Sequence, residues 1–249
     1  MVRQARVIVS ARIRPLRLEG FEQLPKHARR CVFWEVDPQT VGGGRVLPDP
    51  EFEKEAWLSM VMLEWGSCGQ VAEPAPDPDG TDEDRPCLGY AFYAPPRAVP
   101  RSQRFPTGPV SADAVLLTAL GTEPGQPDDL ARQLVAAVIN ELVRRGVRAL
   151  EAFGRTAASA DLRGSAGAGL LPAGEALAIE ALGDCSFELC MIDADFLQSV
   201  GFTVVAPHRY FPRLRLELDK GLGWKAEVEA ALDRLLESER LPQPAAATV

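Results

Sequence analysis

Residues 112–120 read Ala-Asp-Ala-Val-Leu-Leu-Thr-Ala-Leu, an apolar run that predicts a buried β-strand. A turn rich in Gly, Pro and Asp follows and ends at Pro127, and the pattern then predicts a helix over 129–145. Residues 147–153 read as the next strand. A strand–helix–strand unit of this length implies a right-handed crossover between two parallel strands. The apolar side chains of the helix fall on one stripe: Leu130, Leu134, Val135, Val138, Ile139, Leu142 and Val143.

The two ends of this helix carry recognisable signals. We expect Asp128 to cap its start through the first-turn amides, and Gly146 to end it in the left-handed conformation. A strand that delivers a turn onto a helix N-terminus can hold a pyrophosphate, because free amides and the helix dipole converge there. Here the turn carries Asp128 and Asp129, where such a cradle favours glycine and positive charge.

The composition is that of a soluble globular protein. Of 249 residues, 46% are hydrophobic and 25% are charged. The net charge of -8 argues against non-specific nucleic-acid binding, which needs a basic surface. There is no apolar leader segment, and no run approaches the ~20 apolar residues of a spanning helix. We therefore expect a cytoplasmic protein without a membrane partner.

The cysteines and histidines show no pattern typical of a metal site. The five cysteines (31, 68, 87, 185 and 190) contain no C-x-x-C pair, and His27 and His208 add no zinc-type spacing. The sequence therefore predicts no metal ligands. We expect the cysteines to be reduced thiols, buried or partly buried, as is usual in a cytosolic protein.

Other elements are predicted on both sides of the central unit. The N-terminal half favours a strand, two helices and two strands, at 6–18, 21–30, 51–65, 69–73 and 88–94. Near the C-terminus we expect a short helix at 194–200, capped by Asp193, and strands at 202–206 and 211–218. In the helix at 51–65, the expected apolar face carries Phe52, Ala56, Met60 and Leu63.

The domain organisation follows from shifts in composition. We expect one domain over 1–219, which includes an acidic loop at 74–86 and an Ala/Gly-rich insertion at 155–184. A C-terminal amphipathic helix is predicted at 220–241, because large apolar residues recur there at helical spacing. The tail at 242–249 is expected to be disordered.

The order of these elements resembles the GCN5-related N-acetyltransferase (GNAT) superfamily, whose members bind acetyl-CoA. Leu88-Gly-Tyr-Ala resembles the family's third strand, and 194–202 resembles its late F-Y-x-x-x-G-F element. The strand 113–120 with its turn and helix resembles the acetyl-CoA motif, and Cys31-Val-Phe-Trp-Glu looks like a C-x-F/Y-W-E element of one subfamily. The resemblance implies an α+β fold of three layers, α/β/α, with a mixed, centrally splayed sheet.

The resemblance also implies where acetyl-CoA would bind. In the motif R/Q-x-x-G-x-G/A, glycines let backbone amides approach the pyrophosphate. Here Gln126-Pro-Asp-Asp-Leu-Ala matches as Q-x-x-D-x-A, so Asp129 replaces the first glycine. A carboxylate ~5 Å from a diphosphate costs on the order of 1–3 kcal/mol at an effective dielectric near 20. The implied cofactor-binding residues are Leu117, Thr118, Ala119, Leu120, Gln126, Asp129, Leu130, Ala131 and Arg132. For Arg132, a solvated position on the helix face is the alternative.

The catalytic groups are less clearly marked. Many family members use a tyrosine of the short late helix as general acid, and the matching residue here is Leu197. Tyr93 and Tyr210 are the nearest substitutes along the chain, although either also fits a core or rim position. For the general base, Glu151 and Glu35 are the candidates: Glu151 lies on the strand across the expected cleft, and Glu35 follows Trp34 in an apolar setting. The alternative for Glu35 is an ion pair with an arginine such as Arg29.

The sequence is compatible with two functions. The first is an acyl-CoA-dependent N-acyltransferase, in which a small-molecule or protein amine attacks the thioester directly. The second is a catalytically inactive GNAT-fold protein with a binding or regulatory role, which Asp129 and Leu197 favour. A Rossmann-type nucleotide binder is excluded, because no G-x-G-x-x-G follows a strand. The sequence identifies neither the acceptor nor the acyl chain, and it leaves open whether the chain forms a homodimer.

Overall fold

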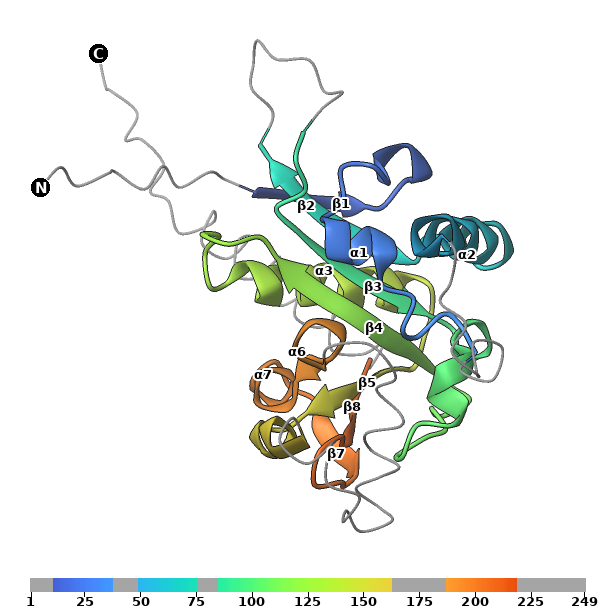
Figure 1. Ribbon diagram of the computed structural model, residues 1–249, viewed down its shortest axis with the longest axis vertical. Coiled ribbons are helices and arrows are strands. Elements are labelled where there is room, and N and C mark those ends of the chain that lie inside the picture. The colour runs from blue at the N-terminus through green and yellow to red at the C-terminus, as the bar shows by residue number, and fades with distance from the viewer. Residues whose placement is uncertain (1–10, 38–48, 76–84, 163–186, 219–249) are drawn as a thin grey trace, which may run out of the picture.

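The structure is a computed structural model, and it describes residues 11–37, 49–75, 85–162 and 187–218 (Figure 1). The predicted helix at 220–241 and the tail at 242–249 lie outside these residues. So do most of the acidic loop and most of the Ala/Gly-rich insertion.

The core of the fold is a mixed, open β-sheet with the strand order β1-β2-β3-β4-β5-β8-β7. Strands β4 and β5 are parallel, as the central strand–helix–strand unit predicts, and the other neighbours in this order are antiparallel. A short strand, β6, pairs with β5 in parallel outside this order. The bounds are β1 Ala11–Pro15, β2 Gly69–Pro74, β3 Gly89–Ala94, β4 Ala114–Thr122, β5 Ala149–Arg155, β6 Ile192–Asp193, β7 Thr203–Ala206 and β8 Arg213–Glu217.

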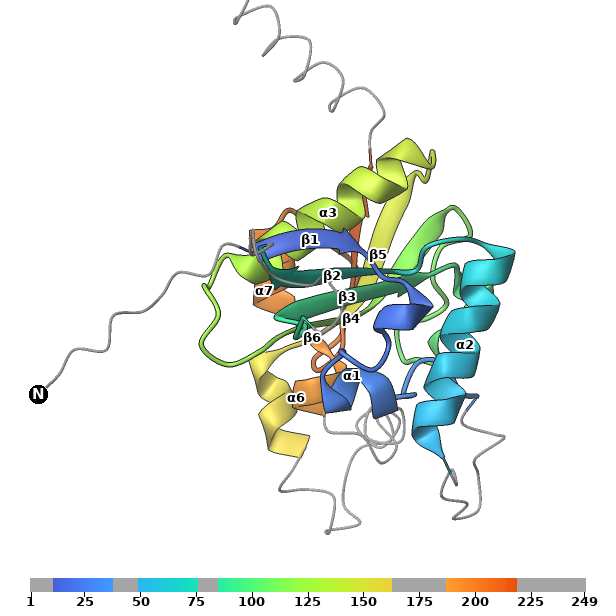
Figure 2. The same ribbon diagram turned by 90° about the horizontal axis from the view of Figure 1, so that it is seen from above.

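Helices cover both faces of the sheet (Figure 2). Helices α1 and α2 pack on one face, in a core cluster that includes Tyr90 and Phe92 of β3. Helices α3 and α7 pack on the other face with Ala91 and Tyr93, because successive side chains of a strand point to opposite faces. The three-layer α+β fold is therefore confirmed. The helix bounds are α1 Lys26–Arg30, α2 Pro50–Glu64, α3 Leu130–Arg144, α6 Phe187–Cys190 and α7 Ala194–Ser199.

Helix α3 confirms the central prediction, except at its start. Gly146 follows the helix with φ of 75°, the left-handed conformation expected of it. The cap position is occupied by Asp129, and its side chain makes no capping bond. Capping by Asp128 is therefore wrong. The Asp129 carboxylate instead accepts a hydrogen bond from Gln133 Nε2, one turn along the helix, at 2.7 Å.

Helix α2 buries the face opposite to the one predicted. Phe52, Met60 and Leu63 are exposed, Leu63 at 88%. The buried face carries Lys54, Trp57, Leu58 and Val61. Two long-range contacts fix this orientation: Trp57 Nε1 donates to the Ala98 carbonyl at 2.7 Å, and Lys54 pairs with Glu35.

Candidate active site

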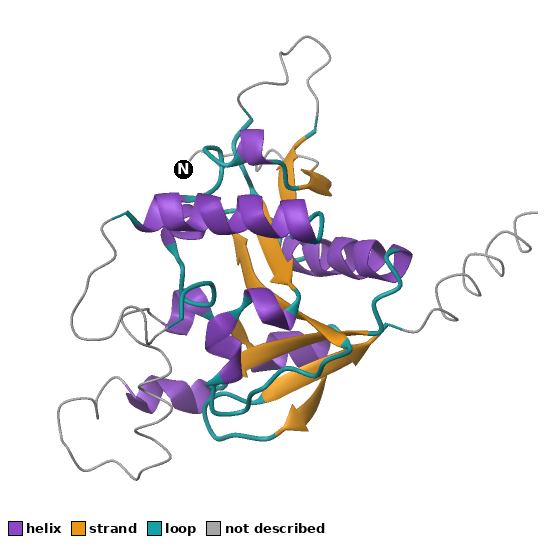
Figure 3. Ribbon diagram, turned by 90° about the vertical axis from the view of Figure 1, so that its right-hand side faces the viewer, coloured by secondary structure: helices purple, strands orange, loops and turns teal. Residues whose placement is uncertain are grey.

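The two central strands pair over only part of their length. Ala114, Val115 and Leu116 of β4 pair with Ala149, Leu150 and Glu151 of β5. Beyond Leu116, β4 continues to Thr122 alongside β3, whereas β5 continues alongside β8 and β6. The two halves of the sheet run at an angle to each other in Figure 3. The sheet is therefore splayed at its centre, as expected, and the second half of β4 has no pairing strand on the β5 side within the described residues.

A β-bulge in β4 lies at the point where the strands separate. Phe92 of β3 pairs with Ala119 and Tyr93 pairs with Leu117, so Thr118 is an extra residue on β4. A bulge bends its strand and increases the local twist, which directs β4 away from β5. Thr118 is buried, and its hydroxyl donates to the Phe92 carbonyl at 3.2 Å. Two of the predicted cofactor residues, Leu117 and Thr118, therefore lie at the bulge, and Ala119 and Leu120 lie on the unpaired edge that follows.

A pocket lies against this bulge on the α1/α2 face of the sheet. Strands β3 and β4 contribute Tyr90, Phe92, Thr118 and Ala119 to its lining. The remaining lining residues come from α1, the segment that follows it, α2 and α6: His27, Ala28, Cys31, Trp34, Glu35, Lys54, Leu189 and Cys190.

Glu35 supplies a carboxylate inside the pocket. Lys54 Nζ lies 2.5 Å from Glu35 Oε1, and only 2% of each side chain is exposed. The other carboxylate oxygen, Oε2, is buried and has no hydrogen-bond partner among the described residues. The alternative pairing of Glu35 with Arg29 is wrong, because Arg29 pairs with Glu51 of α2. Glu35 thus keeps one acceptor oxygen available on a side chain that Lys54 holds in place.

Glu151 has a different environment from the one a general base needs. Its carboxylate is buried and accepts hydrogen bonds from Arg213 at 2.5 Å, Arg215 at 3.1 Å and the Ser111 amide at 3.1 Å. Burial alone would raise the pKa of Glu151, but the hydrogen bonds from Ser111 and Arg213 outweigh it and hold the pKa below its ordinary value. The geometry therefore gives Glu151 a structural role, at the last β4–β5 pair before the splay.

Tyr93 lies on the other side of the sheet from the pocket. It packs in the α3 cluster, and its hydroxyl accepts a hydrogen bond from Gln70 Nε2 at 3.3 Å. Tyr90, two residues earlier, lines the pocket instead. Gly121 of β4 makes room for it, since a Cβ at Gly121 would lie 2.8 Å from the Tyr90 hydroxyl. Tyr90 is in the Leu88-Gly-Tyr-Ala motif, which is the sequence signal that could have indicated it.

The first turn of α3 offers amides but little positive charge. The turn before it contains Gln126, whose amide donates to the Glu123 carbonyl at 3.3 Å, and Leu130 donates to the Pro127 carbonyl at 3.1 Å. Because the helix has no side-chain cap, the amides of Ala131 and Arg132 face outward from its N-terminus. The carboxylates of Asp128 and Asp129 are exposed next to them.

Arg132 connects α3 to α7. Its guanidinium donates to the Ser199 carbonyl and to the Ser199 hydroxyl, each at 3.0 Å, and lies 5.8 Å from the centroid of the Phe196 ring. This contact competes with the predicted role of Arg132 in phosphate binding. Leu197 of α7 is fully buried, so the position that corresponds to the family's general acid is a core position here.

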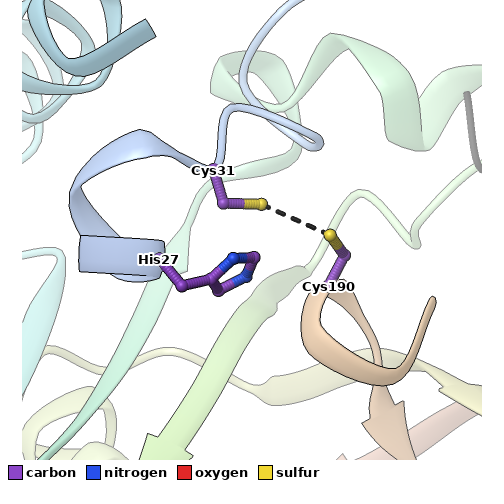
Figure 4. Close-up of side chains that lie close together, drawn as sticks. All are labelled: His27, Cys31 and Cys190. Atoms are coloured by element: carbon purple, nitrogen blue, oxygen red, sulfur yellow. Dashed lines mark hydrogen bonds between the residues drawn. The ribbon is translucent and has the colours of Figure 1, made fainter. Parts of the chain in front are cut away.

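Sequence reasoning missed one group of pocket residues. His27, Cys31 and Cys190 lie together although 159 residues separate the two cysteines (Figure 4). Burial lowers the pKa of His27 and raises that of Cys31, so both side chains are neutral at neutral pH. Cys190 is disulfide-bonded, which corrects the expectation that every cysteine is a reduced thiol.

No helix of the described residues is both long enough and apolar enough to cross a membrane.

The strand order, the parallel central pair and the splay at the β4 bulge agree with the fold that the resemblance to the GNAT superfamily implies. No family model matches this chain, and no curated protein matches it. Solved structures similar to it include the PaiA N-acetyltransferase of Thermoplasma acidophilum in complex with coenzyme A, at 12% identity and a TM-score of 0.43 over 84% of this chain and 99% of that one. An N-acetyltransferase from Staphylococcus aureus Mu50 matches at 14% identity and a TM-score of 0.43 over 84% and 99%. The ribosomal-protein-S18-alanine N-acetyltransferase of Escherichia coli matches at 14% identity and a TM-score of 0.37 over 84% and 95%. At this similarity, the activity has to be inferred from the residues of the chain itself.

Proposed function

We propose that this protein is an acyl-CoA-dependent N-acyltransferase that acylates an amine held in the pocket against the β4 bulge. One observation carries the proposal: the pocket holds a buried carboxylate oxygen that has no hydrogen-bond partner in the described part of the chain, next to the strand segment that separates from its neighbour. Acetyl-CoA is the expected donor, and the acceptor is a small-molecule or protein amine.

Two features of the chain fit a coenzyme A group. The edge of β4 after Thr118, which no described strand pairs with on the β5 side, offers backbone amides and carbonyls to the amide groups of a pantetheine arm, in the manner of an added strand. The uncapped first turn of α3 offers the amides of Ala131 and Arg132 to a diphosphate. When bound, acetyl-CoA would supply an activated acyl group. Asp129 opposes diphosphate binding, so we expect weak affinity.

The pocket residues have complementary tasks in this proposal. Glu35 Oε2 accepts a hydrogen bond from the incoming amine, orients its lone pair and takes up the proton that the amine loses. Lys54 holds the carboxylate in place through its contact with Oε1. Tyr90 keeps its proton, because burial raises the pKa of its phenol, and can donate a hydrogen bond to the sulfur of the leaving thiolate.

The second candidate function is a GNAT-fold protein that binds a ligand without transferring an acyl group. Two observations favour it: Arg132 already bonds to Ser199, and exposed carboxylates flank the helix N-terminus. Both weaken the diphosphate site and leave the pocket itself intact.

The first experiment measures binding. Acetyl-CoA at 100 times its dissociation constant should stabilise the native protein by about 2.7 kcal/mol, which a thermal-unfolding assay detects. The absence of a shift with acetyl-CoA and with longer acyl-CoAs would overturn the proposal. A shift without acyl transfer to any member of a broad amine panel, followed by mass spectrometry, would favour the second candidate.

The second experiment tests the role of Glu35. Because Glu35→Gln alone leaves Lys54 buried without its counter-charge, the double variant Glu35→Gln/Lys54→Met is the better probe. We expect it to keep the shift with acetyl-CoA and to lose about 100-fold or more in turnover. Glu51→Gln, which removes a partly exposed carboxylate of α2, is the matched control and should keep its turnover. Unchanged turnover in the double variant would exclude Glu35 as the base.

A further inference from the structure

Three side chains with metal-binding atoms converge at one end of the pocket. His27 and Cys31 come from α1 and its C-terminal end, and Cys190 is the last residue of α6 (Figure 4). One donor atom from each of the three lies within 4.8 Å of the other two. The Sγ atoms of Cys31 and Cys190 are 3.5 Å apart.

These distances suit a tetrahedral ion with thiolate and imidazole ligands. Zinc binds cysteine sulfur at about 2.3 Å and histidine nitrogen at about 2.0–2.1 Å. Two sulfurs at a tetrahedral angle on such an ion lie roughly 3.8 Å apart. The two sulfurs here therefore need to move apart by only a few tenths of an ångström, which small rotations of the side chains supply.

The hydrogen bond of His27 orients its ring for this task. Its Nε2 lies 3.1 Å from the carbonyl oxygen of Leu189, the residue before Cys190. Since a carbonyl only accepts, Nε2 carries the proton and Nδ1 keeps its lone pair. A metal-binding histidine typically donates its other ring N–H to a backbone carbonyl or a carboxylate in this way.

The backbone of α1 fixes the spacing of the first two ligands. His27 and Cys31 are four residues apart, so their side chains leave the helix on the same side. The Cys31 amide donates to the His27 carbonyl at 2.8 Å, which extends the helical geometry to Cys31. Two of the three donors are thus placed by one turn of helix, and only Cys190 is brought in from a distant part of the chain.

We propose that His27 Nδ1, Cys31 Sγ and Cys190 Sγ form a binding site for a thiophilic divalent ion of the zinc type. The ion binds the reduced protein and ties α1 to α6. The fourth tetrahedral position is left to water or to a further donor. The site lies beside the proposed acyl-transfer pocket but does not depend on acyl transfer.

The oxidation state of Cys190 controls this site. In the structure Cys190 is disulfide-bonded, and zinc binds a thiolate rather than a disulfide sulfur. A dithiol reductant supplies the two electrons and two protons that convert the disulfide into two thiols, and is itself oxidised to a disulfide. Zinc then displaces one proton each from Cys31 and Cys190. Oxidation and metal binding are therefore mutually exclusive at Cys190.

The test is zinc binding by the full chain in the absence of acyl-CoA. Protein reduced with a phosphine and freed of metal by a chelator is dialysed against zinc, and the bound metal is measured by mass spectrometry. We expect one equivalent in the reduced protein and none in the oxidised protein. Cobalt(II) in place of zinc should give the sulfur-to-metal charge-transfer absorption that marks thiolate ligands.

Variants assign the ligands. His27→Gln and Cys31→Ser should each weaken zinc binding by about 100-fold or more, since even the loss of a residue that only supports a ligand costs about 10–100-fold. The matched control is Cys87→Ser, because Cys87 is buried, donates to the Gly89 carbonyl and lies outside the cluster. Thermal unfolding of the metal-free variants verifies that they fold.

Three results would overturn the proposal: no stoichiometric zinc in the reduced wild type, equal affinity in the oxidised protein, or unchanged affinity in both ligand variants. A protein that binds zinc and fails to bind acetyl-CoA would contradict only the proposed acyltransferase function.

Discussion

Replacing Glu151 by glutamine should remove the main electrostatic support of the sheet at its splay. Glu151 is buried on β5, opposite Leu116, in the last β4–β5 pair. Its carboxylate accepts from Arg213, Arg215 and the Ser111 amide, so it joins β8 and the segment before β4 to the centre of the sheet. Glutamine has nearly the same shape but no charge, and its amide nitrogen would face one of these donors.

The expected loss of stability follows from the burial of this network. Breaking a buried ion pair by removing one partner costs about 3–5 kcal/mol, because the remaining charge stays buried without compensation. Arg215 keeps Asp113 and Glu217 as partners, which favours the lower end of that range. For a domain of this size, about 3–5 kcal/mol corresponds to a fall in Tm of about 6–20 °C.

Urea unfolding of the wild type and two variants tests this reasoning. Glu217→Gln is the matched control, because Glu217 also pairs with Arg215, at 2.6 Å, but is 69% exposed. This control variant should lose less than about 1 kcal/mol of unfolding free energy. If Glu151→Gln and Glu217→Gln cost the same, burial is not what makes Glu151 important, and the structural role assigned to it fails.

The pH dependence of stability gives a second test of the role of Glu151. The pKa of Glu151 is lower in the folded protein than its ordinary value, so the unfolded chain binds the proton more readily. The stabilisation is complete above the ordinary glutamate pKa, about 4.3, and is lost as the pH falls through the lower, folded value. Glu151→Gln should flatten this acid limb of the stability profile.

The remaining predictions concern α2, α7 and the turn before α3. Lys54→Met should lower the free energy of unfolding, measured with urea, by about 3–5 kcal/mol, since it leaves Glu35 buried without its counter-charge. A loss below about 1 kcal/mol would contradict the stabilising role of the Lys54–Glu35 ion pair. Gly154→Ala should lower the free energy of unfolding by about 1–3 kcal/mol, because the added Cβ would lie 2.9 Å from the Cβ of Ala194. An unchanged free energy of unfolding would show that α7 can shift away from β5. Asp129→Asn should tighten acetyl-CoA binding by calorimetry by about 1 kcal/mol, roughly fivefold, and weaker binding would remove this turn from the cofactor site.

The sequence predicted the elements whose signals are local. The apolar stripe of α3, the glycine after it and the strands on either side all appear as expected, because periodicity and capping act within one or two turns. The buried face of α2 could not be predicted in this way. The large apolar side chains Phe52, Met60 and Leu63 of α2 are exposed, whereas Trp57, Leu58 and Val61 are buried, and contacts with residues 35 and 98 decide which side turns inward.

The candidate site was predictable only in part. Glu35 was identified as a candidate because it follows Trp34 in an apolar segment, but its partner Lys54 comes from a helix that gave no sign of a buried lysine. The bulge at Thr118 depends on the register between β3 and β4, which no single strand reveals. For the group of His27, Cys31 and Cys190, the four-residue spacing of His27 and Cys31 was a usable signal. The position of Cys190 next to them could not be predicted, because it depends on the tertiary fold.

The pocket has walls that are made at very different times during synthesis. Strands β1 to β4 pair in order as antiparallel neighbours, so this half of the sheet can assemble from contacts between successive elements. The wall that contains Leu189 and Cys190 meets α1 only after more than half of the chain has been added, and such distant contacts form late because closing long loops is entropically costly. A ribosome-bound chain that ends shortly after β5 would therefore carry β1–β4 but only one side of the pocket, and the pocket would be completed in the last stage of folding.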